Sequence, residues 1–253
     1  CAYFNSLNDT LEQAQINKKE LISKKLILEE GQSVLDIGCG WGGMAAHIYK
    51  KSNASVVGVT LSEEQYAYAN QRKINEKLNK VEYRLQDYRN VNETYDRIVS
   101  VGMFEHVGTS HYQEFFNKVY DLLNDTGVAL IHTIGRLTEP TNNDPWIEKY
   151  IFPGGYIPAL SETMFRVEKS GLTLADVQVL KFHYAETLKR WRYNFYDNID
   201  KVKELYDEKF CRMWDFYLSS SQASFEEAGL VVFQLQLSKN KKTVPDKRDY
   251  LLA

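Results

Sequence analysis

Two titratable residues follow an apolar stretch near the middle of the chain. The segment VSVGMFEHVG, residues 99–108, runs from a strand-like sequence directly into Glu105 and His106. A carboxylate at the end of a buried strand can accept a proton or hold a protonated oxyanion, and it can equally cap a helix or form a buried salt bridge. Glu105 is therefore a candidate catalytic residue, whereas His106 is expected to be a hydrogen-bonded structural histidine.

A glycine-rich segment, VLDIGCGWGG, follows the first predicted strand of the core. Gly38, Gly40 and Gly42 let the backbone approach a ligand closely, although a tight turn without a ligand has the same spacing. Asp36 lies two residues before the first glycine, where its carboxylate would repel a pyrophosphate and attract an ammonium group. The segment therefore favours a cationic nucleoside such as S-adenosylmethionine over NAD.

The end of the second predicted strand differs from a dinucleotide site. Such sites usually present an acidic residue about 20 residues after the glycines. Here the strand ends in Thr60, Leu61 and Ser62. A hydroxyl group or Glu63 would therefore have to contact the ribose.

Apolar runs that alternate with helical patterns would position these residues. Near-continuous apolar runs are typical of parallel strands buried on both faces, and the alternation predicts a doubly wound sheet with ligands at the carboxyl ends of its strands. The predicted strands cover residues 33–38, 54–62, 95–102 and 127–135, and the predicted helices cover residues 8–28, 41–51, 63–78 and 110–123, with Ser62 as an N-cap.

The pattern changes after residue 135. Residues 136–158 contain four of the five prolines and predict a long loop with a short helix, a length that usually marks a lid. The sequence then predicts a strand at 172–180, helices between residues 184 and about 221, and a last strand at 230–237 before a basic tail.

Composition limits the classes of protein that fit. The formal charge of −3, from 31 basic and 34 acidic residues, excludes the basic surface typical of nucleic-acid binding. Cys1, Cys39 and Cys211 match neither a disulfide framework nor a zinc spacing, which indicates a reducing, cytoplasmic location. No apolar run approaches the ~20 residues of a membrane span. The chain begins without methionine, so a longer protein is expected.

Several segments together resemble one family. They are CAYF, VLDIGCGWGG, VVGVTLSEEQ, LQDYR, DRIVSVGMFEHVG, LIHTIG, DPWIEKYIFPGG and HYAETLKRW. In this combination and order they resemble the catalytic domain of cyclopropane-fatty-acyl-phospholipid synthases and the related mycolic acid cyclopropane synthases. Two departures are the absence of the Tyr and small polar residue that precede the cysteine in the family, and of the N-terminal domain of the phospholipid-type enzymes.

The resemblance implies a class I S-adenosylmethionine-dependent methyltransferase fold. This is a Rossmann-like α/β fold with a mostly parallel seven-stranded sheet, helices on both faces, and a helical and loop insertion over the active site. One catalytic domain over residues 1–253 would comprise N-terminal helices (1–30), a cofactor-binding core (31–135), an insertion that covers the acyl chain (136–229), and the last strand with the basic tail (230–253).

The resemblance also implies two ligand sites and no metal. The contacts to S-adenosylmethionine would fall on Asp36, Gly38, Thr60, Leu61, Gln65, Gln86, Asp87 and Tyr88, with Gly40 of the glycine loop as a further cofactor-binding residue. A bicarbonate ion would lie near Cys1, Glu105, His132, Ile134 and Tyr184. Without the resemblance, His132 in an apolar strand would be expected to be a buried, hydrogen-bonded histidine.

The implied reaction adds a methylene to a cis double bond of a phospholipid acyl chain. The resulting carbocation must be shielded from water, stabilised and deprotonated, and aromatic faces suit the first two tasks. Aromatic candidates, each of which could equally be ordinary packing, are Tyr3, Phe4, Trp146, Tyr150, Phe152, Tyr156, Tyr184 and Trp191. Alternatives are a methyltransferase that yields branched or hydroxylated lipids, and a non-catalytic fragment that binds lipid or cofactor.

A membrane lipid substrate predicts peripheral contact with the inner face of the cell membrane. A basic and aromatic rim is expected around Lys181, Lys189, Arg190 and Arg192 and at the lysine pairs 18–19 and 24–25, although solvated helix faces explain these charges equally well. The helical region 8–28 could instead form the surface of a homodimer. The sequence does not specify acyl length, double-bond position or head group.

Overall fold

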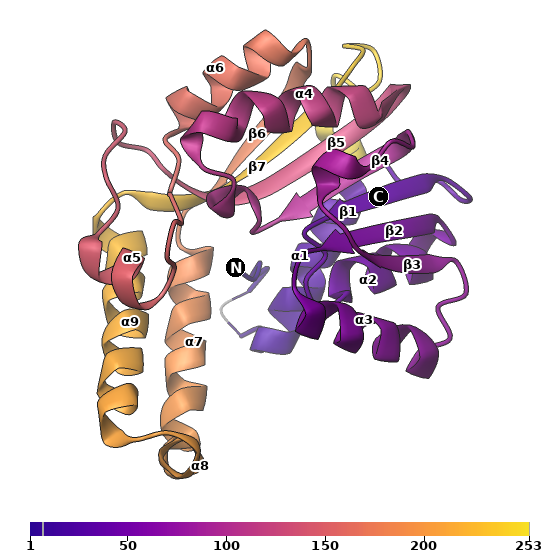
Figure 1. The fold of residues 1–253 in the computed structure, drawn as a ribbon. Helices are drawn as coiled ribbons and strands as arrows, with labels where there is room; N and C mark the ends of the chain where they lie inside the picture. Colours follow the sequence, from indigo (N-terminus) through magenta and orange to yellow (C-terminus); the bar gives the residue numbers. More distant parts are fainter. Residues whose placement is uncertain (7, 253) are drawn as a thin grey trace.

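A mixed seven-stranded sheet forms the centre of the computed structural model, which describes residues 1–6 and 8–252 (Figure 1). The strands are β1 (Ser33–Ile37), β2 (Ser55–Thr60), β3 (Val81–Leu85), β4 (Tyr95–Val101), β5 (Leu123–Arg136), β6 (Thr173–Leu180) and β7 (Leu230–Ser238), in the order β3-β2-β1-β4-β5-β7-β6. Strands β1 to β5 pair in parallel, whereas β7 is antiparallel to both β5 and β6. The expected mostly parallel sheet is confirmed.

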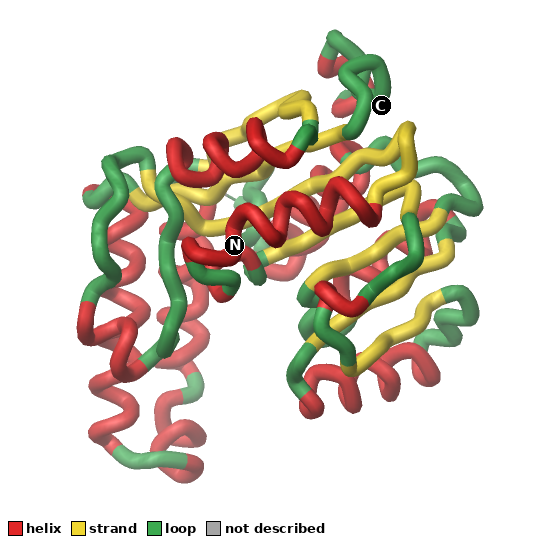
Figure 2. Tube along the Cα trace, turned by 45° about the horizontal axis from the view of Figure 1, so that its top comes forward, coloured by secondary structure: helices red, strands yellow, loops and turns green. Residues whose placement is uncertain are grey.

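Helices cover both faces of this sheet (Figures 1 and 2). The helices α1 (Leu11–Lys25), α2 (Gly43–Ser52) and α3 (Glu63–Asn75) lie on one face, and α4 (Tyr112–Leu122) and α6 (Leu160–Ser170) lie on the other. Neighbouring strand residues point to opposite faces, so Val34 packs with the first group of helices and Leu35 with the second. Each face therefore has its own hydrophobic core.

Local signals explain where the predicted helices begin and end. Ser62 caps α3 as expected, because its hydroxyl oxygen accepts a hydrogen bond from the amide of Gln65 at 3.2 Å. Helix α3 ends at Asn75, earlier than the predicted residue 78, and Lys77 has a φ of 54° in the turn that follows. Within the region 8–28 the structure has the single helix α1, which begins at Leu11 after the N-cap Thr10 and ends at Lys25.

Two elements were not predicted, namely β3 and α6. Strand β3 pairs with β2 alone, and its sequence VEYRL has buried and exposed positions in alternation rather than an apolar run. Helix α6 packs against α4. The short helix expected in the 136–158 loop is present as α5 (Pro145–Tyr150), where Asp144 is the N-cap and proline is the first helical residue.

A helical hairpin extends from one edge of the sheet (Figure 1). It consists of α7 (His183–Asp197), α8 (Ile199–Leu205) and α9 (Glu208–Glu227), and its interior contains Leu188, Leu218 and Phe225. The hairpin lies beyond the carboxyl ends of the parallel strands, because β6 ends and the reversed strand β7 begins at that edge. Within the described residues, no helix is both long enough and apolar enough to cross a membrane.

Candidate active site

The first part of the site is a buried carboxylate at the end of β1. The Asp36 side chain is 1% exposed, and neither of its oxygens has a hydrogen-bond partner among the described residues. Burial raises the pKa of this carboxyl group to about 7. A buried carboxylate without a partner suits a cationic ligand group, as the sequence indicated.

The glycine loop places glycine backbone, which has no side chains, next to Asp36. The amides of Gly38 and Cys39 both donate to the carbonyl oxygen of Val59 at 3.0 Å, which fixes the loop against the end of β2. A Cβ atom on Gly38 would lie 2.6 Å from Cγ of Met103, whereas a Cβ atom on Gly40 would project into open space. The backbone at Gly40 is therefore accessible to a ligand, and the loop fits S-adenosylmethionine.

The remaining predicted cofactor residues lie at the carboxyl ends of β2 and β3. The Thr60 hydroxyl donates to the Gln65 side-chain oxygen at 3.0 Å, and Leu61 is 72% exposed. The carboxylate of Asp87 already pairs with the guanidinium of Arg89, which holds the pKa of Asp87 below its usual range.

Gln86 and Tyr88 flank Asp87. The amide of Gln86 donates to the carbonyl oxygen of Thr60 at 3.0 Å, so the ends of β2 and β3 are in direct contact. The ring of Tyr88 packs edge-on against Phe115 of α4 at a centroid distance of 5.6 Å. Its aromatic face therefore belongs to the hydrophobic core.

A cavity of about 560 Å³ lies beyond the ends of β4 and β5 and the start of β7, and α5, α7 and α9 complete its wall. This volume is within the usual range for small-molecule sites. All five residues that the resemblance placed around bicarbonate line this one cavity: Cys1, Glu105, His132, Ile134 and Tyr184. The structure therefore brings together residues from four separate parts of the chain, since His132 and Ile134 both lie on β5.

Glu105 is held by the neighbouring strand. It lies in the short 3-10 helix η2 (Phe104–His106) after β4, and it is 8% exposed. One carboxylate oxygen accepts a hydrogen bond from the amide of Ile134 at 2.6 Å, while the other has no partner among the described residues. Burial raises the pKa of Glu105, so a proton or a protonated oxyanion at its second oxygen is favoured.

His132 is buried and hydrogen-bonded, as its apolar strand indicated. Its Nδ1 atom lies 3.1 Å from the side-chain nitrogen of Gln234 on β7, and with this nitrogen as the donor the ring proton is on Nε2. Burial lowers the pKa of His132 well below its usual value, so the ring is neutral. A neutral imidazole can donate one hydrogen bond into the cavity.

Helix α7 carries Tyr184 and also holds the N-terminal segment that carries Cys1. The amide of Ala2 donates to the Thr187 hydroxyl at 3.0 Å, and the amide of Phe4 donates to Nδ1 of His183 at 3.1 Å. These two bonds fix the segment that carries Cys1 against the helix that carries Tyr184.

The loop after β4 joins the cavity to the glycine loop. Gly102 lines the cavity, and its amide donates to the carbonyl oxygen of His132 at 2.8 Å. The next residue, Met103, contacts the position where Gly38 lacks a side chain. The two predicted ligand sites are therefore adjacent.

Four of the eight aromatic candidates line the cavity, namely Trp146, Phe152, Tyr156 and Tyr184, and the other four do not. The expectation that His106 is a hydrogen-bonded structural residue is wrong. It is exposed at the cavity, and its ring meets Phe152 edge-on at 6.0 Å.

The sequence did not reveal the wall that α9 contributes. Its lining residues recur every four positions, a spacing that places them on one side of the helix. They are Phe216, Tyr217, Ser220, Ser221, Ser224, Phe225 and, just after the helix, Ala228. Three aromatic and four small residues share this side, a pattern that marks a packed face without indicating what it packs against.

Most of the basic side chains expected at a rim already have a partner within the chain. Lys189 pairs with Glu186, and Arg192 pairs with Asp215. The lysine pair 24–25 does not belong to a rim, because Lys25 is buried near Asp176 and Lys24 donates to the carbonyl oxygen of Leu251 at 3.1 Å.

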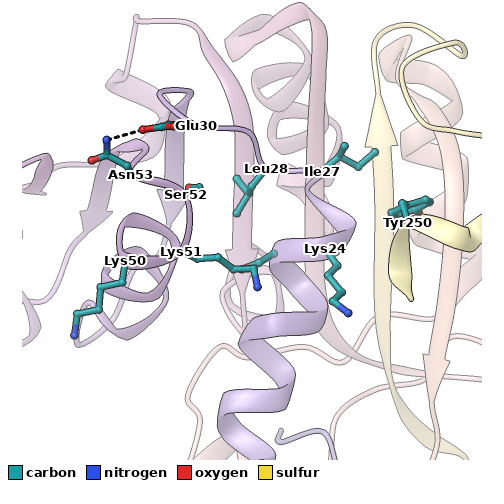
Figure 3. Close-up of a pocket in the computed structure, with 10 residues that line it drawn as sticks. Lys24, Ile27, Leu28, Glu30, Lys50, Lys51, Ser52, Asn53 and Tyr250 are labelled. Carbon is teal, nitrogen blue, oxygen red and sulfur yellow. Dashed lines mark hydrogen bonds between the residues drawn. The ribbon is translucent and has the colours of Figure 1, made fainter. Parts of the chain in front are cut away.

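A second hollow lies at the amino ends of the strands, between the ends of α1 and α2 (Figure 3). Two of its lysines already have partners, since Lys50 pairs with Glu76 and Lys51 with Glu20. Ligands of such sheets bind at the opposite edge. The cavity at the carboxyl ends is therefore the candidate active site.

The strand order and the glycine loop after β1 define the fold of S-adenosylmethionine-dependent methyltransferases. A family model described as mycolic acid cyclopropane synthetase matches residues 1–235. The chain belongs to this family, which confirms the resemblance seen in the sequence.

Individual relatives agree with this assignment. The cyclopropane-fatty-acyl-phospholipid synthase of Escherichia coli (strain K12) is 40% identical over 239 residues, which cover 94% of this chain and 61% of that protein. The structure of cyclopropane synthase MmaA2 from Mycobacterium tuberculosis matches with a TM-score of 0.88 and 33% identity, over 94% of this chain and 89% of that one.

A second solved structure carries ligands. Mycolic acid cyclopropane synthase CmaA1, complexed with SAH and CTAB, matches with a TM-score of 0.87 and 33% identity, over 94% of this chain and 88% of that one. The chain spans less than two thirds of the E. coli relative.

Proposed function

We propose that this chain transfers a methylene from S-adenosylmethionine across a cis double bond of an unsaturated phospholipid acyl chain, giving a cyclopropane. The observation that carries the proposal is the half-satisfied, buried carboxylate of Glu105 in a cavity adjacent to the glycine loop. Membership of the family and the printed activity of the E. coli relative support it.

Four features of the chain would bind S-adenosylmethionine. Asp36 would pair with the ammonium group, Gly40 would offer open backbone, and Leu61 would cover an apolar face of the nucleoside. Thr60 and Gln65 would supply polar contacts at the end of β2. When bound, S-adenosylmethionine supplies an electrophilic methyl group.

The cavity would shield and deprotonate the carbocation. Trp146, Phe152 and Tyr184 line it, and aromatic faces attract cations while they exclude water. Bicarbonate would bind between the second oxygen of Glu105 and the Nε2–H of neutral His132, and would take the proton from the added methyl group. A small diffusible base suits this position, because proton loss from a carbocation needs a well-placed base rather than a strong one.

The test is an incubation of the full chain with methyl-labelled S-adenosylmethionine and vesicles of cis-unsaturated phospholipid, with and without added bicarbonate. Mass spectrometry of the acyl chains should show a gain of one methylene that resists hydrogenation and depends on bicarbonate. A methyl-branched or hydroxylated product would contradict cyclopropanation. Absence of transfer by a chain that binds the cofactor would favour the non-catalytic alternative.

We also propose peripheral contact with the inner face of the cell membrane. The aromatic side chains Phe182 and Tyr193, 62% and 59% exposed, lie before and on α7 and support this contact. Flotation with phospholipid vesicles tests it, and Phe182→Ser should reduce the bound fraction. Dimer formation stays a prediction. The buried face of α1 packs within its own chain, which leaves that face unavailable to a partner.

A further inference from the structure

One positively charged side chain that lines the cavity, that of Arg136, has no role in the proposed reaction. Arg136, the last residue of β5, lies on the same side of the strand as His132 and Ile134, because alternate side chains of a strand share a face. All three line the cavity. At a rise of about 3.3 Å per residue, this row runs about 13 Å from His132 to Arg136.

The position of Arg136 is fixed by the 157–158 segment. Its backbone amide donates to the carbonyl oxygen of Pro158 at 2.9 Å, and its Nε atom donates to the carbonyl oxygen of Ile157 at 3.1 Å. The residue is only 8% exposed. The guanidinium is therefore held at the cavity wall by its stem and by one of its five N–H groups.

The rest of the guanidinium has no partner in the chain. Among residues 1–6 and 8–252, Arg136 forms no salt bridge, and its two terminal nitrogens donate no hydrogen bond. Neither carboxylate that lines the same cavity forms a salt bridge with Arg136: Asp144 caps α5 through the amide of Trp146, and Glu105 accepts from the amide of Ile134 through one of its two oxygens. The terminal nitrogens are not among the fully buried atoms, so they open into the cavity, where an anion can reach them and would supply the missing counter-charge.

We propose that Arg136 binds the phosphate of the substrate's head group. Planar guanidinium edges bind phosphate oxygens in a bidentate manner, and the two free terminal nitrogens of Arg136 offer such an edge. This proposal rests on the proposed function, since it assumes that an acyl chain runs from the reacting end at His132 towards Arg136. Arg136 then determines specificity for lipids whose head group contains a phosphate.

The first test measures binding without turnover. Dodecyl phosphate and dodecyl maltoside are titrated into the full chain, with calorimetry as the main readout and tryptophan fluorescence, to which Trp146 in the cavity wall contributes, as a second one. Arg136→Gln should weaken binding of dodecyl phosphate by about 10- to 100-fold, the usual effect of losing charged hydrogen bonds, and leave dodecyl maltoside within twofold. Lys50→Gln, which removes a cation at the opposite edge, is the matched control and should change neither.

The second test uses turnover. For Arg136→Gln, kcat/KM should fall mainly through KM with phosphatidylglycerol as substrate, and should stay unchanged with diacylglycerol of the same acyl chains. Arg136→Lys keeps the charge but not the bidentate edge, and should be intermediate. An equal loss with both lipids would mean a merely structural role and would overturn the proposal.

Two further outcomes are informative. The first distinguishes a lipid head group from a free phosphate ion, and the second distinguishes failure of the Arg136 proposal from failure of the proposed function. If dodecyl phosphate binds the wild type no more tightly than inorganic phosphate does, and Arg136→Gln weakens both equally, the site binds a free ion, and the head-group assignment is wrong. If the wild type shows no methyl transfer but Arg136 still discriminates dodecyl phosphate from dodecyl maltoside, the anion site stands and the proposed function fails.

Discussion

The unpartnered carboxylate of Asp36 makes the affinity for S-adenosylmethionine dependent on pH. Its pKa of about 7 means that the carboxyl group is mostly protonated at pH 5.5 and about half ionised at pH 7.0. The ammonium group of the ligand is attracted only to the ionised form, so binding at the lower pH must expel a proton. Affinity should therefore rise between pH 5.5 and pH 7.0.

The size of the effect follows from the ionised fraction. With a pKa of about 7, this fraction is about 0.03 at pH 5.5 and about 0.5 at pH 7.0, a ratio of about 16. The affinity should change by the same factor, which corresponds to roughly 1.6 kcal/mol. The ligand's own amino group stays mostly protonated over this range, because α-amino groups titrate at about 7.7–8.0.

Calorimetry in two buffers of different ionisation enthalpy measures both the affinity and the protons released. Asp36→Asn should bind about 10- to 100-fold more weakly at pH 7.0 and show no slope with pH. Adenosine, which lacks the ammonium group, should bind the wild type equally well at both pH values. A flat profile in the wild type, or the same slope in Asp36→Asn, would refute the reasoning.

Three substitutions test other parts of the structure. Glu105→Gln should lower turnover by about 10²- to 10⁴-fold in single-turnover kinetics and keep cofactor affinity within twofold. Gly42→Ala should lower the free energy of unfolding in urea by roughly 2 kcal/mol or more, because its Cβ atom would lie 2.5 Å from the Tyr83 hydroxyl oxygen. Lys25→Met should raise that free energy by roughly 1–3 kcal/mol, since the fully buried ammonium group of Lys25 has no hydrogen-bond partner among the described residues, while Asp176 keeps its ion pair with Arg248.

Matched variants control these three predictions. Gly40→Ala introduces the same left-handed strain in open space, so it should cost only about 1 kcal/mol of stability while it weakens cofactor binding. Lys24→Met removes a partly exposed lysine and should give no gain in stability. Near-normal turnover of Glu105→Gln, equal effects of the two glycine variants, or a less stable Lys25→Met would each contradict the corresponding assignment.

The cofactor half of the fold was largely predictable from the sequence. Strands β1, β2, β4 and β5 are buried on both faces, and continuous apolar runs report that burial directly. The strand β3 was missed because its residues alternate between buried and exposed, a weaker signal over five residues. The contact between Glu105 and Ile134 depends on the pairing of β4 with β5, which no local pattern contains.

The cavity wall was harder to predict. Arg136 falls in a proline-rich stretch that reads as a loop, but it belongs to β5 because it pairs with Leu230 on the reversed strand β7. The face of α9 that carries Ser220 and Phe225 is amphipathic like that of any packed helix, and only the tertiary structure decides what it faces.

Because β7 runs antiparallel to its neighbours, the helical hairpin is attached at one edge of the sheet, apart from the strands of the cofactor site. The chain leaves the sheet after Leu180 and returns at Leu230 on the same edge, so the α7–α9 hairpin is attached through neighbouring strand ends, and its cluster also includes Val232 of β7.

The hairpin also carries Tyr184 and holds the segment of Cys1 through His183 and Thr187. Exchange of residues 181–229 between relatives, with these three α7 residues retained, should therefore change the preference for lipid shape and leave cofactor affinity unchanged.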